Sequence, residues 1–262
     1  MLILLPPSEG KTAPRRGAPL SLAGLDLPAL AEPRERLLDL LVSLSSADPD
    51  GTAAALGLGP GQADLVGRNA ALRSVPTARA DKVYSGVLYD ALGLDTLDAA
   101  ARRRATRWVV ITSALFGVVR PGDRIPAYRL SGDTKLTGLP GAGVVSAYWK
   151  PSLDPVLTDL AGTGLVIDLR SSMYAAFWRP APTIGPRVAT VRVLHEHEGT
   201  RKVVSHFNKA TKGRIVRALL TDGGTPRTPA ELATQLADLG WTVETGPATK
   251  SGTQLDVVVA EV

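Results

Sequence analysis

Four apolar stretches along the chain share one design: residues 2–5, 108–112, 164–169 and 202–205. Each is continuous rather than alternating in hydrophobicity, which is typical of strands covered on both faces. Each also ends in a polar cluster. The pattern predicts an α/β fold, with a mixed, largely parallel central sheet flanked by helices. In such sheets, ligands bind outside the carboxyl ends of the strands.

Helical periodicity alternates with these runs. The amphipathic stretches are 32–45, 62–73, 152–161 and 207–220. A further helix is expected to begin at Thr228, an N-cap followed by proline and glutamate, and to run to Gly240. Two late strands, 241–245 and 255–259, and a hairpin of 188–194 with 201–205 around Glu198-Gly199 complete the expected elements.

The composition is that of a globular protein, with 44% apolar and 21% charged side chains among 262 residues, and a single domain spanning 1–262 is expected. There is no cysteine, which excludes disulfides and thiolate chemistry. No apolar run approaches the roughly 18 residues that span a bilayer. We therefore expect a cytoplasmic protein with no membrane partner.

The basic residues are concentrated in two segments. Residues 101–130 hold seven arginines and one acid, Asp123, whereas 199–217 hold six lysines and arginines and no acid. The whole chain carries only +5, so the rest of the sequence is acidic. This asymmetry favours an anionic partner, and solvated helix faces are the alternative.

Two short motifs resemble ligand-binding motifs but match them only in part. Gly10-Lys11-Thr12 lacks the first glycine of a phosphate loop, since Leu5 stands there, and Pro14 prevents the helix that should follow. Lys11 remains a candidate phosphate ligand from a loop. His195 and His197 have metal spacing without a third ligand, so an exposed hairpin tip is expected. We expect neither a metal nor a cofactor.

Residues 168–174, DLRSSMY, follow an expected strand. They suggest a proton-transfer site with Asp168 as base and Tyr174 as acid. Lys209 is a third catalytic candidate. An internal ion pair with a helix cap at Ser171 or Ser172 is the alternative.

A helical hairpin is expected after Lys82. A first helix would end at Leu92, a turn would follow at Gly93, and a second helix would run from Thr96 to Arg104. Such a helix-hairpin-helix element offers amide donors to a backbone phosphate. An ordinary hairpin packed on the sheet is the alternative.

The stretch 113–130, SALFGVVRPGDRIPAYRL, carries arginines on a loop that proline and glycine restrain. Restrained arginines lose less freedom on binding phosphate. Nearby aromatic side chains suit base stacking or the core. The candidate nucleic-acid ligands are Lys11, Lys82, Tyr84, Arg120, Arg124, Tyr128, Arg129, Arg170, Lys209, Lys212 and Arg214.

Six ordered motifs resemble those of the YaaA family of bacterial peroxide-stress proteins: PPSEGKT, KVYSGVLY, 113–130, SAYWK, DLRSSMY and SHFNKATKG. The resemblance implies an α/β fold with a basic cleft and a helix-hairpin-helix element near 83–104. It also implies binding of duplex or distorted DNA that limits oxidative damage. The positions that carry over are Lys11, Tyr84, Arg120, Asp123, Tyr128, Arg129, Asp168, Tyr174, Lys209 and Lys212.

The chain departs from the family pattern at Ala127, where proline is common, and at Met173, where an acid is common. We expect a DNA-binding stress protein of low sequence specificity. The alternative is an enzyme acting on a small phosphorylated or nucleotide-like substrate at the strand ends, and a small anionic ligand is a second possible partner.

Overall fold

A computed structural model describes residues 1–140, 143–197, 200–202 and 205–260 of the chain. Within these residues an eight-stranded sheet runs in the order β4-β3-β1-β6-β7-β10-β9, and β8 pairs with β7. The fold is α/β and the sheet is mixed and mostly parallel, as predicted. Its strands are β1 (Leu2–Leu5), β3 (Val109–Ser113), β4 (Gly117–Val119), β6 (Val166–Asp168), β7 (Val188–His197), β8 (Thr200–Lys202), β9 (Thr242–Thr249) and β10 (Gly252–Ala260).

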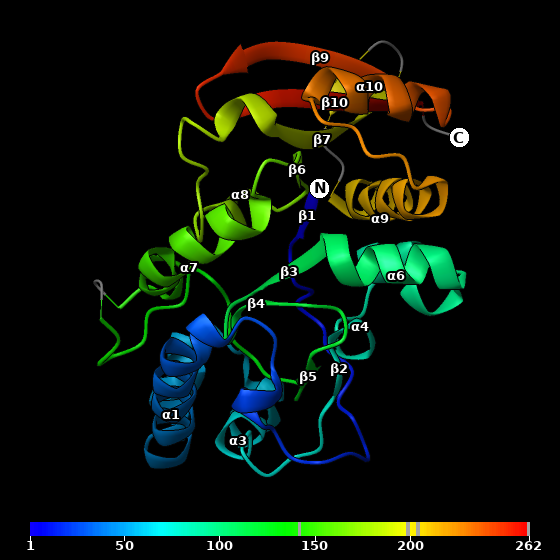
Figure 1. Ribbon diagram of the computed structural model, residues 1–262. Coiled ribbons are helices and arrows are strands. Elements are labelled where there is room, and N and C mark those ends of the chain that lie inside the picture. Colours follow the sequence, from blue (N-terminus) through cyan, green and yellow to red (C-terminus); the bar gives the residue numbers. More distant parts are fainter. Residues whose placement is uncertain (141–142, 198–199, 203–204, 261–262) are drawn as a thin grey trace.

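The helices and a two-stranded ribbon surround this sheet (Figure 1). The ribbon pairs β2 (Ala78–Arg79) with β5 (Arg124–Ile125). The helices are α1 (Ala31–Ala47), α2 (Pro49–Ala55), α3 (Asp64–Ala70), α4 (Ala80–Val83), α5 (Val87–Leu92), α6 (Ala99–Trp108), α7 (Val145–Ala161), α8 (Ser172–Ala175), α9 (Ser205–Asp222) and α10 (Pro229–Asp238).

Strands β3, β1 and β6 form the buried centre of the sheet. β1 pairs in parallel with both neighbours, and all its residues are buried. Helices α6 and α9 lie on one side of Figure 1, and α7 and α8 lie on the other. Because the three strands are parallel, their carboxyl ends bring Pro6, Ser113 and Asp168 to one edge of the sheet.

Two predicted helix starts are wrong. Helix α7 begins at Val145 rather than 152 and contains Pro151 and Pro155. Burial of Trp149, whose indole Nε1 donates to the carbonyl of Ala114 at 2.8 Å, outweighs the proline penalty. The second helix of the hairpin begins at Ala99, not Thr96.

The run 202–205, predicted as one strand, is divided between two elements: Lys202 ends β8 and Ser205 begins α9. β8 pairs antiparallel with β7 and Ser205 opens α9, while residues 203–204 lie outside the described residues. The hairpin itself is confirmed, although its tip at 198–199 is also outside them. The start predicted for the last helix is confirmed too, because Thr228 Oγ1 accepts from the Glu231 amide at 3.2 Å, although α10 ends at Asp238.

Candidate functional site

Three hydroxyl groups, one from Tyr84 and two from the segment 113–130, meet at the carboxyl end of β3. The Tyr128 hydroxyl lies 3.0 Å from that of Tyr84 and 2.8 Å from Ser113 Oγ. Both phenols are buried, and burial raises the pKa of each. The chain of hydroxyls therefore remains protonated and forms a rigid polar floor.

Lys11 lies over this floor. Its loop is held by a β-bridge between Lys11 and Tyr84 and by a bond from the Thr12 amide to the Val83 carbonyl at 2.9 Å. The Lys11 Nζ atom is 4.3 Å from the centre of the Tyr128 ring, a cation–π distance. The ammonium also donates to the Ser8 carbonyl at 2.9 Å.

Arg129 is the second cation of this region. Its backbone exchanges two hydrogen bonds with the Asn69 side chain, at 2.7 and 2.9 Å. Its side chain is half-buried, and its Nε atom is buried with no hydrogen-bond partner among residues 1–140, 143–197, 200–202 and 205–260. We call Lys11, Tyr84, Ser113, Tyr128 and Arg129 the strand-end cluster.

The two cations of the cluster influence each other. Burial first, and then the charge of Arg129, lower the pKa of Lys11 to about 7, while Glu9 opposes the shift. Among the described residues neither cation forms an ion pair within 4.0 Å, and Glu9 is exposed. The cluster therefore presents positive charge that no carboxylate of the described chain neutralises.

Asp168 is engaged in a buried ion pair. Its two oxygens accept from Arg170 Nε at 2.9 Å and Nη2 at 2.7 Å. Arg170 also donates to the carbonyls of Trp178 and Tyr174. This geometry favours the internal ion pair over the proton-transfer interpretation, because Arg170 already occupies both oxygens of the carboxylate. Burial also raises the pKa of the Tyr174 phenol.

Lys212 lies behind this pair. Its Nζ atom donates to the Leu169 carbonyl at 2.9 Å, and burial lowers its pKa against the opposing charge of Asp168. Lys209, one turn earlier on α9, is exposed. Lys212 therefore connects α9 to the end of β6, whereas Lys209 faces solvent.

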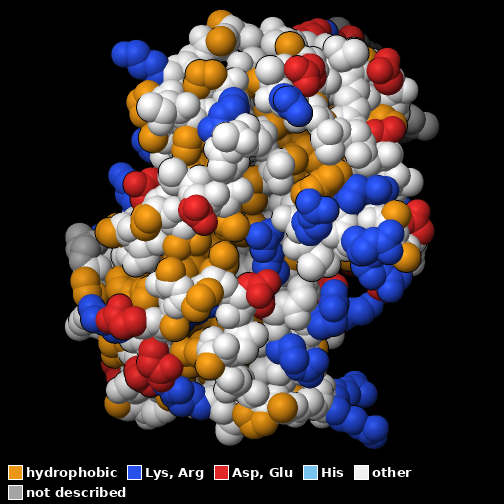
Figure 2. Space-filling view, in the orientation of Figure 1, with side chains coloured by type: hydrophobic (Ala, Val, Ile, Leu, Met, Phe, Trp, Pro, Cys, Tyr) orange, Lys and Arg blue, Asp and Glu red, His pale blue; other side chains and the backbone are white. Residues whose placement is uncertain are grey.

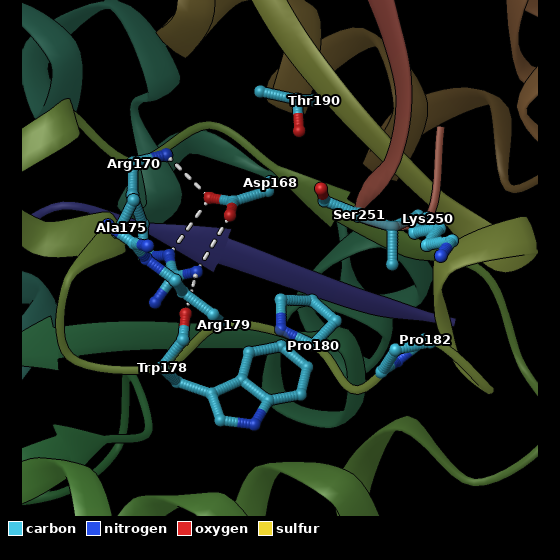
Figure 3. Close-up of a pocket in the computed structure, with 11 residues that line it drawn as sticks. Asp168, Arg170, Ala175, Trp178, Arg179, Pro180, Pro182, Thr190, Lys250 and Ser251 are labelled. Carbon is cyan, nitrogen blue, oxygen red and sulfur yellow. Dashed lines mark hydrogen bonds and ion pairs between the residues drawn. The ribbon is translucent and has the colours of Figure 1, made fainter. Parts of the chain in front are cut away.

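A pocket of ≈ 420 Å³ lies beside the Asp168–Arg170 pair (Figure 3). The close-up shows the two side chains directed toward each other, with Trp178 on one side and Lys250 on another. Its lining includes two exposed cations, Arg179 and Lys250. Sequence reasoning missed both, because neither lies in a motif and only the fold brings them to Asp168.

The two basic segments meet on the surface of α6 and α9. Arg104 Nε donates to the Leu220 carbonyl at 2.7 Å and so joins the two helices. Both helices also carry exposed cations that form no ion pair among the described residues. We call the surface formed by four of them, Arg103, Arg107, Lys209 and Arg214, the α6/α9 face. In Figure 2, lysine and arginine side chains gather over these helices.

The expected hairpin turn is present at Gly93, but its surroundings differ from the expectation. Arg217 of α9 donates to the Gly93 carbonyl at 2.9 Å, which packs the turn against α9. The Asp98 carboxylate accepts from the Ala101 amide at 2.7 Å and caps α6. Lys82 pairs with Asp95 at 2.9 Å. The first amides of α6 thus already face a carboxylate.

The arginines of 113–130 separate in space. Arg120 donates to the Arg107 carbonyl at 3.0 Å, and Arg124 donates to the Thr77 carbonyl at 2.8 Å. Asp123 accepts from the amide of Arg120, which closes the turn from Arg120 to Asp123, and it also accepts from the amide of Asp26. Of the three arginines, only Arg129 joins the strand-end cluster.

The amino-acid sequence is similar to that of known proteins over most or all of its length. The family profile described as peroxide stress protein YaaA matches residues 1–245. The chain belongs to the YaaA family. A UPF0246 protein of Streptomyces coelicolor is 52% identical over the full length of both chains. A UPF0246 protein of Corynebacterium efficiens is 46% identical, with 93% of this chain and 95% of the relative covered.

The YaaA motifs contribute to both regions. PPSEGKT supplies Lys11, KVYSGVLY supplies Tyr84, and 113–130 supplies three further members of the strand-end cluster. SHFNKATKG supplies Lys209 to the α6/α9 face. Family motifs that are far apart in sequence therefore meet at the ends of β1 and β3.

The histidine and membrane expectations can also be examined. His195 is buried, not exposed, and its ring lies 5.3 Å from that of Phe207, while the side chain of His197 is outside the described residues. Where the structure describes the chain, no group of three or more potential ligands could hold a metal ion. Nor does any described helix combine the length and apolarity needed to cross a membrane.

Proposed function

We propose that this YaaA-family protein binds DNA through the α6/α9 face and thereby limits oxidative damage to DNA during peroxide stress. The observation that carries the proposal is a set of exposed cations on two packed helices, with no carboxylate partner among the described residues. Cations of this kind neutralise phosphates and release counterions from DNA.

The form of the face favours contact with the DNA backbone rather than the bases. Arginine presents a planar donor fork that suits phosphate oxygens, and the bond from Arg104 to Leu220 fixes one helix on the other. Phosphate contacts position a protein without reading sequence. The expected preference is therefore for DNA in general, with little dependence on base sequence.

The α6 N-terminus does not carry the proposal. Asp98 caps it, and a carboxylate at that position repels phosphate. The helix-hairpin-helix expectation is therefore replaced, within this proposal, by the side chains of Arg103, Arg107, Lys209 and Arg214. The hairpin contributes by holding α6 in place against α9.

Charge reversal tests the proposal. The double variant Arg103→Glu/Arg214→Glu should weaken binding to duplex, gapped and single-stranded DNA by about tenfold or more, because two phosphate contacts are replaced by repulsion. Fluorescence anisotropy with labelled oligonucleotides measures the affinity. The effect should be similar on every base sequence tested.

A matched control changes the net charge equally at another surface. Lys135 and Lys150 are exposed and form no ion pair among the described residues, and Lys150 belongs to α7, on the opposite side of Figure 1. The variant Lys135→Glu/Lys150→Glu should bind DNA nearly as well as the unmodified protein. Equal losses in both double variants would refute binding by the α6/α9 face.

The second candidate function, an enzyme acting on a small phosphorylated substrate, draws support from the strand-end cluster. Asp168 gives it little support as a base, because Arg170 occupies both of its oxygens. Lys11 and Arg129 give it a place where an anion could be held.

A further inference from the structure

Lys11 and Arg129 form an unusual pair, because half-buried cations normally face a carboxylate. Here Lys11 lies 4.3 Å from the centre of the Tyr128 ring, Arg129 is the next residue along the chain, and the charge of Arg129 disfavours that of Lys11. Glu9, which acts on Lys11 in the opposite sense, is exposed and makes no ion pair with it in the described chain. Such an arrangement is costly unless another anion completes it.

Both cations retain donors that the described chain does not use. An ammonium has three N–H groups, and Lys11 gives one to the Ser8 carbonyl. The buried Nε of Arg129 has no acceptor within the part of the chain that the structure describes. The Tyr128 hydroxyl is hydrogen-bonded to those of Tyr84 and Ser113, which fixes the floor. The unused donors of the two cations remain available to an acceptor on a ligand.

The cluster is also well placed for a ligand. It lies at the carboxyl end of β3, beside the loop that leaves β1, where α/β sheets bind small molecules. The ring of Tyr128 restrains the ammonium from below, at 4.3 Å, so little side-chain freedom remains to be lost on binding.

We propose that Lys11 and Arg129 bind the phosphate group of a phosphate monoester, held above the floor of Tyr84, Ser113 and Tyr128. Two cations match a group that carries a charge of about −1.5 to −2 at neutral pH and offers three acceptor oxygens. Arginine and lysine are the side chains that most often hold phosphate. This site shares no residue with the α6/α9 face, so the inference does not rest on the proposed DNA binding.

The same chemistry has two possible sources: a small free phosphate ester such as a nucleotide, and the terminal phosphate of a DNA strand. Isothermal titration calorimetry with inorganic phosphate, AMP and adenosine tests the first. Short oligonucleotides that differ only in a 5′-phosphate or a 5′-hydroxyl test the second. AMP should bind and adenosine should not, and a preference for the phosphorylated oligonucleotide would extend the site to DNA ends.

Two variants locate the site. Lys11→Met keeps an unbranched side chain over the Tyr128 ring, and Arg129→Met removes the second cation. Each should weaken AMP binding at least tenfold, while the surface control Lys150→Met should leave it unchanged. AMP that binds equally well to both cluster variants, or no better than adenosine to the unmodified protein, would overturn the proposal.

A measurement on the unmodified protein covers the case in which the variants fail to fold. AMP titrations at pH 7.5 in buffers of different ionisation enthalpy report the protons exchanged on binding. The phosphate is then almost wholly dianionic, so a net uptake of protons would come from Lys11 becoming charged beside the ligand. Binding without proton uptake would contradict a site that includes Lys11. The Arg103→Glu/Arg214→Glu protein should still bind AMP, because neither residue belongs to the strand-end cluster. Loss of DNA binding alone would therefore leave the phosphate site unaffected.

Discussion

The strand-end cluster and the α6/α9 face are both positive, but they hold their charge in different ways. Lys11 and Arg129 are half-buried, one against the Tyr128 ring and the other next to Tyr128 in the chain, and are held by hydrogen bonds to Ser8 and Asn69. The arginines of the face are exposed to water. The hydrogen bond from Arg104 to the Leu220 carbonyl joins the two helices but does not involve these exposed arginines. Desolvation shifts the pKa of Lys11 to about 7, whereas water and salt screen the exposed cations.

This contrast indicates a division of labour. An exposed face suits a long polyanion, because affinity accumulates over many weak contacts that slide along the backbone. A half-buried pair suits one small anion, because few contacts must each be strong, and a low local dielectric strengthens them. Three measurements would test whether the two regions bind anions in these different ways.

The salt dependence of the two binding events should differ most. With about four phosphate contacts on the α6/α9 face, DNA affinity should fall about a hundredfold between 50 and 200 mM salt. AMP affinity should fall only a few-fold over the same range, because partly buried charges are screened less. Parallel titrations by anisotropy and calorimetry would compare them, and equal slopes would remove the distinction between the regions.

The pH dependence should separate the two regions by about tenfold. Lys11 must be protonated to hold phosphate, and its pKa of about 7 is set by burial and Arg129 against Glu9, with the neutral Tyr84 and Tyr128 beneath it. AMP affinity should therefore decrease as the pH rises above 7. It should also decrease below about pH 6, where the phosphate gains a proton.

DNA affinity should be nearly flat between pH 6 and 8, because arginines on the face stay charged throughout. The variant Lys11→Arg provides the control: it should bind AMP with no loss above pH 7. A Lys11→Arg protein that keeps the original decline would assign the titration to another group.

The sequence predicts the central fold well, and the reason is local. Continuous apolar runs such as 2–5 and 164–169 require burial on both faces, which fixes β1 and β6 in the sheet. Helix α7 shows the limit of local reasoning, since the indole of Trp149 extends the helix past Pro151 through a contact with Ala114, far away in sequence.

The candidate site is harder to predict, because clustering in sequence is not clustering in space. Arg120, Arg124 and Arg129 lie within ten residues of one another, yet they contact different parts of the molecule. Lys11 and Arg129 are distant in sequence and meet through the ends of β1 and β3. No periodicity signals that meeting, although the sequence offers each residue separately as a candidate phosphate ligand.

The smallest expected effect concerns stability. Since the pKa of Lys11 in the folded protein lies below the ordinary lysine value of 10.5, the unfolded chain binds more protons between these values. Stability from this group therefore rises with pH between about 7 and 10.5, and at pH 7 and below the charge destabilises the fold. Lys11→Met removes that charge and should stabilise the protein at pH 7 by about 1 kcal/mol, as substitutions at functional sites often do.

The advantage should shrink at pH 9. Urea unfolding of both proteins at the two pH values measures it, with Lys150→Met, expected within about 0.5 kcal/mol of the unmodified protein at both, as the surface reference. A Lys11→Met protein that is less stable at pH 7 would mean that the ammonium holds the loop together, and the cluster would then resemble the structural arginines of α6 and α9 more than a site awaiting an anion.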